Sequence, residues 1–178
     1  MKKIVLTTWF FCVIAAVIVY GGLRLNLSGS APKGLWFVLP LKFENIKRGM
    51  IVSVCAPHQE IVLKLRDKTV PEGPCPGTNT EPLLKPVAAI PGDEIVLAQN
   101  KNILVNGRAI PNSQAISNIT GWKTGTYKVR PGEVWLVSAY DARSFDSRYF
   151  GPVSFNNILG KAKALLVEGN VREMTEGK

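Results

Sequence analysis

Residues 82–97 read PLLKPVAAIPGDEIVL, an apolar segment with one lysine, a Pro-Gly-Asp turn and a β-branched run. The Pro91-Gly92 pair predicts a turn that introduces a strand at residues 94–97. Working outward, Asn106-Gly107 predicts a tight hairpin with a return strand at 108–110. Further short, β-branched runs predict strands at residues 50–54, 60–65, 102–105 and 133–137. The sequence therefore predicts a mainly β domain.

The lysine within this stretch, Lys85, has only apolar residues and prolines at the three positions before it, counting Pro82, and at the four positions after it. Burial on such a segment disfavours the ammonium form and lowers the pKa. A neutral lysine is a competent general base and replaces histidine in Ser-Lys enzymes. The alternative from this segment alone is a surface lysine whose stem lies along an edge strand.

Two other segments carry candidate chemistry. In residues 26–36, NLSGSAPKGLW, Ser28 and Ser30 flank a glycine, and a bent backbone there presents a hydroxyl and an amide as an oxyanion hole requires. The alternative is a flexible linker. In residues 144–152, SFDSRYFGP, Asp146 and Arg148 can pair beside Ser144 and position a lysine amine. The alternative is a turn with a surface ion pair, which stabilises little.

The N-terminal segment, residues 4–23, is an uncharged run of twenty residues, IVLTTWFFCVIAAVIVYGGL. A helix of this length spans the hydrocarbon core of a bilayer, about 30 Å. The lysines at positions 2 and 3 favour a cytoplasmic N-terminus. We therefore expect cytoplasmic residues 1–3, an anchor at 4–23, a periplasmic domain at 24–167 and a polar, frayed tail at 168–178. The alternative is a cleaved signal peptide, against which the length and bulky exit of the segment argue.

Composition excludes several classes of function. The chain has 178 residues with 22 basic and 13 acidic side chains, a net charge of +9. These basic residues are spread along the chain, which argues against a nucleic-acid patch. His58 is the only histidine, and Cys12, Cys55 and Cys75 form no CxxC pair, so multi-histidine metal sites and zinc ribbons are excluded. Nucleotide-binding glycine motifs are absent from the sequence as well.

Taken in order behind the hydrophobic segment, five boxes resemble those of the type I signal peptidase family. The boxes are SGSAP (28–32), RGMIV (48–52), KPVAAIPGD (85–93), VNG (105–107) and SFDSRYFG (144–151). Within the family the sequence is most similar to the conjugative-transfer peptidases of the TraF group, through PKGLW at 32–36 and the cysteine pair Cys55 and Cys75. Ala31 stands where the family has methionine, and Pro86 where it has a basic residue.

The resemblance implies a signal-peptidase-like β core behind a single transmembrane helix, acting as a membrane-anchored serine endopeptidase. Ser30 is then the nucleophile and Lys85 the general base of a Ser-Lys dyad. The Ser30 amide and the Ser28 hydroxyl hold the oxyanion, and Ser144 orients the amine of Lys85. The remaining implied residues are a supporting pair, Asp146 and Arg148, and a disulfide between Cys55 and Cys75. Neither a cofactor nor a metal is implied.

The implied substrates are exported preproteins with small residues before the cut, and in the TraF group a conjugative pilin precursor, processed by hydrolysis or by cyclisation. The expected location is the bacterial inner membrane, with the catalytic domain in the periplasm beside the conjugation or type IV secretion machinery. If the N-terminal segment were cleaved, the product would be a soluble periplasmic domain. Two alternatives remain: a general leader peptidase, and a non-enzymatic anchored β-domain of a secretion apparatus.

Overall fold

The computed structural model describes residue 9 and residues 22–66, 68–116 and 119–177. Most of the predicted anchor at 4–23, with Cys12 and the cytoplasmic residues 1–3, lies outside this part. Within the described ranges, no helix is both long and apolar enough to cross a membrane. Leu23, which we assigned to the anchor, is instead the first residue of strand β1, where it pairs with Phe37.

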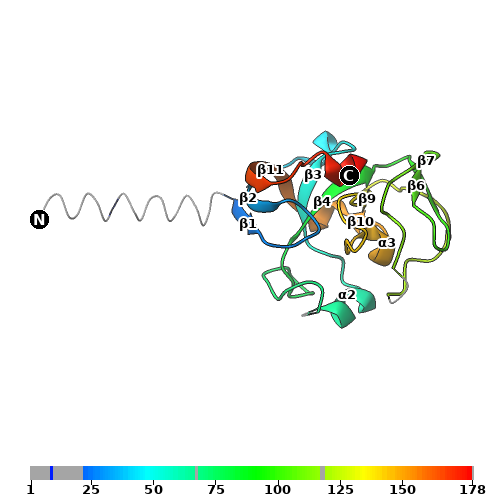
Figure 1. Ribbon diagram of the computed structural model, residues 1–178, viewed down its shortest axis with the longest axis horizontal. Coiled ribbons are helices and arrows are strands. Elements are labelled where there is room, and N and C mark those ends of the chain that lie inside the picture. Colours follow the sequence, from blue (N-terminus) through cyan, green and yellow to red (C-terminus); the bar gives the residue numbers. More distant parts are fainter. Residues whose placement is uncertain (1–8, 10–21, 67, 117–118, 178) are drawn as a thin grey trace, which may run out of the picture.

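The larger of two antiparallel sheets has seven strands in the order β1-β2-β11-β3-β4-β9-β10. Figure 1 shows β1, β2 and β11 at one end of the domain and the smaller sheet at the other. The strands of the larger sheet are β1 (Leu23–Asn26), β2 (Lys33–Leu39), β3 (Ile51–Val54), β4 (Leu83–Ala89), β9 (Glu133–Leu136), β10 (Val153–Ser154) and β11 (Ile158–Glu168). In this order β4 pairs with both β3 and β9, so Lys85 lies on an interior strand.

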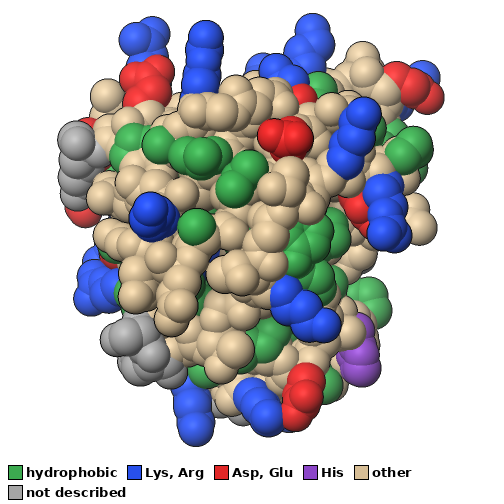
Figure 2. Space-filling view, turned by 90° about the vertical axis from the view of Figure 1, so that its right-hand side faces the viewer, with side chains coloured by type: hydrophobic (Ala, Val, Ile, Leu, Met, Phe, Trp, Pro, Cys, Tyr) green, Lys and Arg blue, Asp and Glu red, His purple; other side chains and the backbone are tan. Residues whose placement is uncertain are grey.

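The smaller sheet has four strands in the order β7-β6-β5-β8. They are β5 (Glu94–Leu97), β6 (Leu104–Val105), β7 (Arg108–Ala109) and β8 (Gly125–Lys128). Asn106 and Gly107 both have positive φ, 49° and 78°, as a tight two-residue hairpin turn requires, so this hairpin is confirmed. On the face at the β6–β7 end, Lys and Arg side chains stand apart from one another, so no single basic patch dominates this face (Figure 2).

Most of the predicted strands are confirmed, and the mainly β prediction with them. The strand at 94–97 is β5, and those predicted at 50–54 and 133–137 are β3 and β9, each slightly shorter. Gly92, with φ of 91°, and Gly132, with φ of 84°, form the Pro-Gly turns that introduce β5 and β9. Three apolar clusters fill the interior, and the one behind β2 and β4 contains Trp36 and Leu84.

The strand predicted at residues 60–65 is wrong, because these residues form helix α2 (Glu60–Leu65). Val62 is fully buried, and Ile61 and Leu65 pack against the same core, a spacing that suits one helical face. Lys64 and Glu60 form an i,i+4 ion pair on the opposite, exposed side. A short apolar run is compatible with the periodicity of a strand and with that of a helix, and here the tertiary contacts favour the helix.

The prediction of a frayed tail at 168–178 is also wrong for the residues described. Glu168 ends β11, and the chain then turns into a short helix, α4 (Glu173–Glu176). Met174 in this helix has no exposed surface, and its carbonyl accepts a hydrogen bond of 2.8 Å from the amide of Ala139. The two apolar side chains of this polar tail, Val171 and Met174, therefore dock it on the interior. The remaining short helices are η1 (Phe43–Asn45), α3 (Ser147–Phe150) and η2 (Phe155–Asn157).

Candidate active site

A cavity of about 540 Å³ brings the predicted nucleophile and base to one place. Ser28 and Ser30 enter it from the loop between β1 and β2, and Lys85 enters from β4. Residues 68–71 and 81–83 line a further part of it, and Asp141, Arg143 and Phe145 line another. Segments that lie far apart in the sequence thus surround the two residues that the sequence singled out.

The loop between β1 and β2, residues 27–32, carries the predicted nucleophile Ser30 and is called the nucleophile loop; Asn26, the last residue of β1, holds it. Its Oδ1 accepts hydrogen bonds from the Ser28 amide at 3.2 Å and the Ser28 hydroxyl at 2.8 Å. Its Nδ2 lies within 3.3 Å of three carbonyl oxygens, those of Ser28, Ala31 and Pro32. Sequence reasoning missed Asn26, although an asparagine two residues before the serine is the pattern of an Asx turn. The loop is therefore a fixed structure rather than a flexible linker.

The serine hydroxyls of this loop lie close together. Ser30 Oγ and Ser28 Oγ are 3.3 Å apart, and Ser30 is partly exposed to the cavity. Behind the loop, the carbonyl of Ser30 accepts a hydrogen bond from the Ser138 hydroxyl at 3.3 Å. Because the Ser28 hydroxyl already bonds to Asn26, it contributes to an oxyanion site only after that bond is exchanged.

Lys85 is almost fully buried, with 1% of its surface exposed, so the alternative of a surface lysine is wrong. Its Nζ donates a hydrogen bond of 2.7 Å to Ser144 Oγ. Burial lowers the pKa of Lys85 from 10.5 to about 8; the charges of Asp146 and Asp141 raise it, and that of Arg148 lowers it. The structure thus brings Ser144 to Lys85 and gives this amine the environment of a general base.

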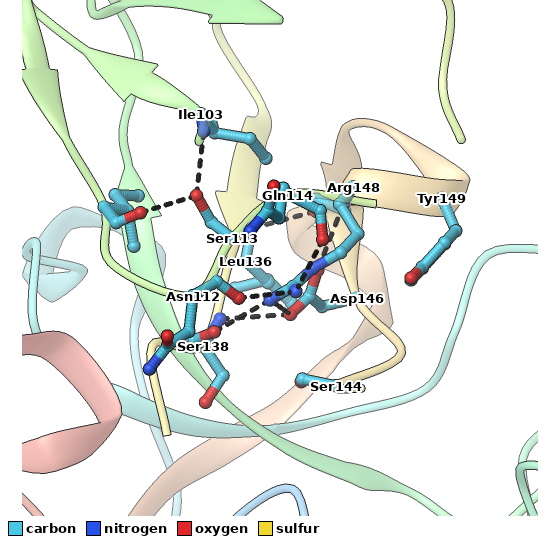
Figure 3. Close-up of polar contacts among 12 residues, drawn as sticks. Ile103, Asn112, Ser113, Gln114, Leu136, Ser138, Ser144, Asp146, Arg148 and Tyr149 are labelled. Carbon is cyan, nitrogen blue, oxygen red and sulfur yellow. Dashed lines mark hydrogen bonds and ion pairs between the residues drawn. The ribbon is translucent and has the colours of Figure 1, made fainter. Parts of the chain in front are cut away.

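Asp146 and Arg148 form an ion pair in the interior, not on the surface. The carboxylate accepts from Arg148 Nε at 2.8 Å and from Nη2 at 2.9 Å. The other guanidinium hydrogens reach the carbonyls of Asn112, Ala142 and Ser138, as Figure 3 shows in part. All five donors of this buried guanidinium therefore have acceptors.

The same aspartate organises the backbone around the site. Asp146 Oδ2 accepts from the amide of Ser138, whose hydroxyl bonds to the nucleophile loop. Its Oδ1 accepts from the amide of Arg148 and so caps the start of α3. The pair therefore fixes the segment that carries Ser144, two residues before Asp146, relative to the loop that carries Ser30. Figure 3 shows Ser138, Ser144, Asp146 and Arg148 together.

Asp141 is a second residue of the site, after Asn26, that the sequence analysis did not single out. Its carboxylate pairs with Arg143 at 3.1 Å at the rim of the cavity. Burial raises the pKa of Asp141, but the hydrogen bonds from Arg143 and its charge together lower it by more. The net pKa is therefore below the usual value, and the carboxylate stays ionised. Asp141 and Arg143 have the same Asp-x-Arg spacing as Asp146 and Arg148. The spacing therefore could not show which of the two pairs is buried and which lies at the rim of the cavity.

A disulfide joins Cys55 and Cys75, the pair that the resemblance implies. Cys55 follows β3, and the loop that the disulfide closes contains α2 and cavity residues 68–71. The covalent bond thus constrains one wall of the cavity. In the described ranges no group of three or more His, Cys, Asp or Glu side chains could hold a metal ion.

Comparisons with known proteins show which family this chain is similar to. The model of the family described as signal peptidase, peptidase S26, matches residues 1–167. Conjugal transfer protein TraF of Agrobacterium tumefaciens (strain 15955) is 33% identical over 159 residues, 86% of this chain and 88% of the relative. Its namesake in Agrobacterium fabrum (strain C58 / ATCC 33970) is 35% identical over 151 residues, 80% and 81% of the two chains.

One solved structure similar to this chain is a signal peptidase I from Enterococcus faecalis V583. It is 18% identical, with a TM-score of 0.40, and the similarity covers 69% of this chain and 98% of the other.

Proposed function

Since the chain belongs to the signal peptidase family, peptidase S26, we propose that it is a serine endopeptidase that cleaves with Ser30 and Lys85. The observation that carries this proposal is the environment of Lys85. A lysine that is buried, is bonded to Ser144 and has a pKa lowered to about 8 shares a cavity with a partly exposed serine. A structural lysine would have no need of such a cavity.

The reaction begins when Ser30 Oγ turns from Ser28 toward Lys85 and attacks the scissile carbonyl carbon. Lys85 Nζ, neutral at that moment, takes the hydroxyl proton and later gives it to the leaving amine. The Ser30 amide and the Ser28 hydroxyl donate to the oxyanion once Ser28 has left Asn26. Ser144 supports this step because its hydroxyl fixes the position of the amine.

The acyl ester on Ser30 is then released by an amine or by water. If the acceptor is the amino terminus of the substrate itself, the product is cyclic, and this requires the amine to reach the ester before water does. If water is the acceptor, the product is a linear chain with a new carboxylate. Both outcomes use the same Ser30 and Lys85.

For the substrate we propose a conjugative pilin precursor. The support is that relatives covering four fifths or more of this chain are named conjugal transfer proteins. We further propose that residues 4–23 anchor the chain in the inner membrane and that the catalytic domain works in the periplasm. The Cys55–Cys75 disulfide supports this location, because such bonds persist in an oxidising compartment.

The experiment is deletion of the gene in a conjugative host that keeps its ordinary leader peptidase, followed by mass spectrometry of the pilin. We expect loss of pilin maturation and of mating, with normal export of other proteins. Wild type and a Ser154→Ala control, which changes an exposed serine on β10, restore both, whereas Ser30→Ala and Lys85→Ala restore neither. The mass of the mature pilin distinguishes a cyclic from a linear product.

Three results would overturn parts of the proposal. Mature pilin in the Ser30→Ala strain would remove the peptidase role. Mating restored by Ser30→Ala would support a non-enzymatic scaffold. A general export defect with mature pilin would indicate a general leader peptidase.

A further inference from the structure

We infer that the C-terminal helix α4 belongs to the frame of the active site and that Met174 is a positioning residue for Ser30 and Lys85. The inference rests on the proposed function, because it assigns the tail a role in that same reaction. It goes beyond that function by including a segment that contributes no residue to the catalytic cavity.

The first observation is the burial of Met174. It is the fully buried residue of α4, whose N-cap Arg172 and last residue Glu176 are exposed, and α4 packs against β4. A four-residue helix has too few internal hydrogen bonds to be stable alone, so its position depends on the packing of Met174, with Val171 beside it. The tail is therefore docked on the apolar cluster behind the strand that carries Lys85.

The second observation is the identity of the apolar cluster that Met174 joins. Its members include Ala31, which follows Ser30, and Leu84, which precedes Lys85. Leu84 belongs to this cluster and also lines the cavity beside Lys85, so the cluster reaches the cavity wall through β4. The cluster thus packs behind both catalytic residues at once, and Met174 fills part of it.

The third observation is the backbone contact of the same residue. The Met174 carbonyl accepts from the amide of Ala139 at 2.8 Å. The preceding residue, Ser138, bonds through its hydroxyl to the Ser30 carbonyl and through its amide to Asp146. The segment 138–139 is therefore held by α4, the nucleophile loop and the buried ion pair together, and Figure 3 shows Ser138 beside Asp146 and Arg148.

These contacts predict how the reaction responds when Met174 is shortened. A void behind Ala31 and Leu84 lets the nucleophile loop and β4 shift relative to each other, and a small misplacement of reacting groups costs up to about a hundredfold in rate. Met174 does not line the cavity, so this change removes no side chain that a substrate there could touch. We therefore expect Met174→Ala to lower kcat about tenfold or more and to leave KM within about twofold.

The test is steady-state cleavage of a purified conjugative pilin precursor by the full chain in detergent, well below the unfolding midpoint. Met174→Leu, which conserves volume, should restore kcat. Ile95→Ala is the matched control, because Ile95 is equally buried but lies in the smaller sheet. It should lower the unfolding temperature and leave kcat unchanged. If Met174→Ala fails to fold, Met174→Val gives the same comparison with a smaller void.

The outcomes separate this inference from the proposed function. If the wild type does not cleave the precursor, or Ser30→Ala still does, the proposed function fails. If the wild type cleaves and Met174→Ala has the kcat of the wild type, α4 is a stabilising element only and the inference is overturned. The same holds if Ile95→Ala loses as much kcat as Met174→Ala.

Discussion

At the scale of single residues, the chemistry depends on where one proton resides. Lys85 is ringed by charges of both signs, with Asp146 and Asp141 favouring its ammonium form and Arg148 opposing it. Burial outweighs them and leaves the pKa at about 8. A base must be unprotonated to act, so activity should fall at acid pH, where Lys85 becomes protonated.

We therefore expect kcat/KM to rise with pH and to level off above about pH 8, the pKa of Lys85. Below that value it should fall about tenfold for each pH unit, as the neutral fraction falls. Lys85→Arg should be inactive at every pH, since a guanidinium keeps its proton. The measurement is a pH–rate profile with folding followed by circular dichroism, and a flat profile between about pH 5 and pH 9 would exclude Lys85 as the base.

Asn26 provides a second prediction at this scale. Its side chain holds the loop of Ser28 and Ser30 by both its amide and its carbonyl. Asn26→Ala should lower kcat/KM at least about tenfold, because the serines lose their fixed geometry. Asn102→Ala is the control, as Asn102 accepts from the Ser113 amide outside the residues that line the catalytic cavity. Equal activity of Asn26→Ala and the wild type would contradict a positioning role for Asn26.

At the scale of elements, α3 and its cap connect the ion pair to the sheet. Asp146 caps α3 and holds Arg148, and Ser147 accepts a hydrogen bond from the amide of Leu136 in β9. Four residues could not form a stable helix without these contacts. The element therefore exists because its polar groups are satisfied from outside it.

Asp146→Ala should lower the free energy of unfolding by about 3–5 kcal/mol, because it leaves the buried guanidinium of Arg148 without its counter-ion. Asp141→Ala is a matched control, since Asp141 and Arg143 have the same spacing but Arg143 is 81% exposed. That change should cost less than about 1 kcal/mol. Urea unfolding of the two variants measures both values, and a similar small loss for each would show that the buried pair does not stabilise the fold.

At the scale of the whole molecule, the disulfide ties the helix-bearing loop to the larger sheet. Cys55 and Cys75 are 20 residues apart, and closing a loop of this size contributes about 3 kcal/mol. A reductant should therefore lower the unfolding temperature of the wild type. The Cys55→Ser, Cys75→Ser double variant should be insensitive to reductant. Complete labelling of both thiols without reductant would show that the bond does not form.

The sequence alone determined the local features of this protein. The Pro-Gly and Asn-Gly turns specified their own geometry, since only residues that tolerate positive φ suit those positions. β-Branched runs predicted β3, β5 and β9, and the five boxes pointed to Ser30 and Lys85 as the candidate pair. Each of these signals lies within a few neighbouring residues, which is why it can be recognised without a structure.

Only the tertiary structure decided whether a local pattern would be buried, and against what. Residues 60–65 form a helix because Ile61, Val62 and Leu65 lie on one helical face and pack against the core. Of two Asp-x-Arg pairs with identical spacing, Asp146 and Arg148 form a buried ion pair, whereas Asp141 and Arg143 form an ion pair at the rim of the cavity. The polar tail docked through Met174, and Asn26 gained its role from the turn around it. Burial is set by contacts between residues that lie far apart in the chain, and a local pattern carries no information about them.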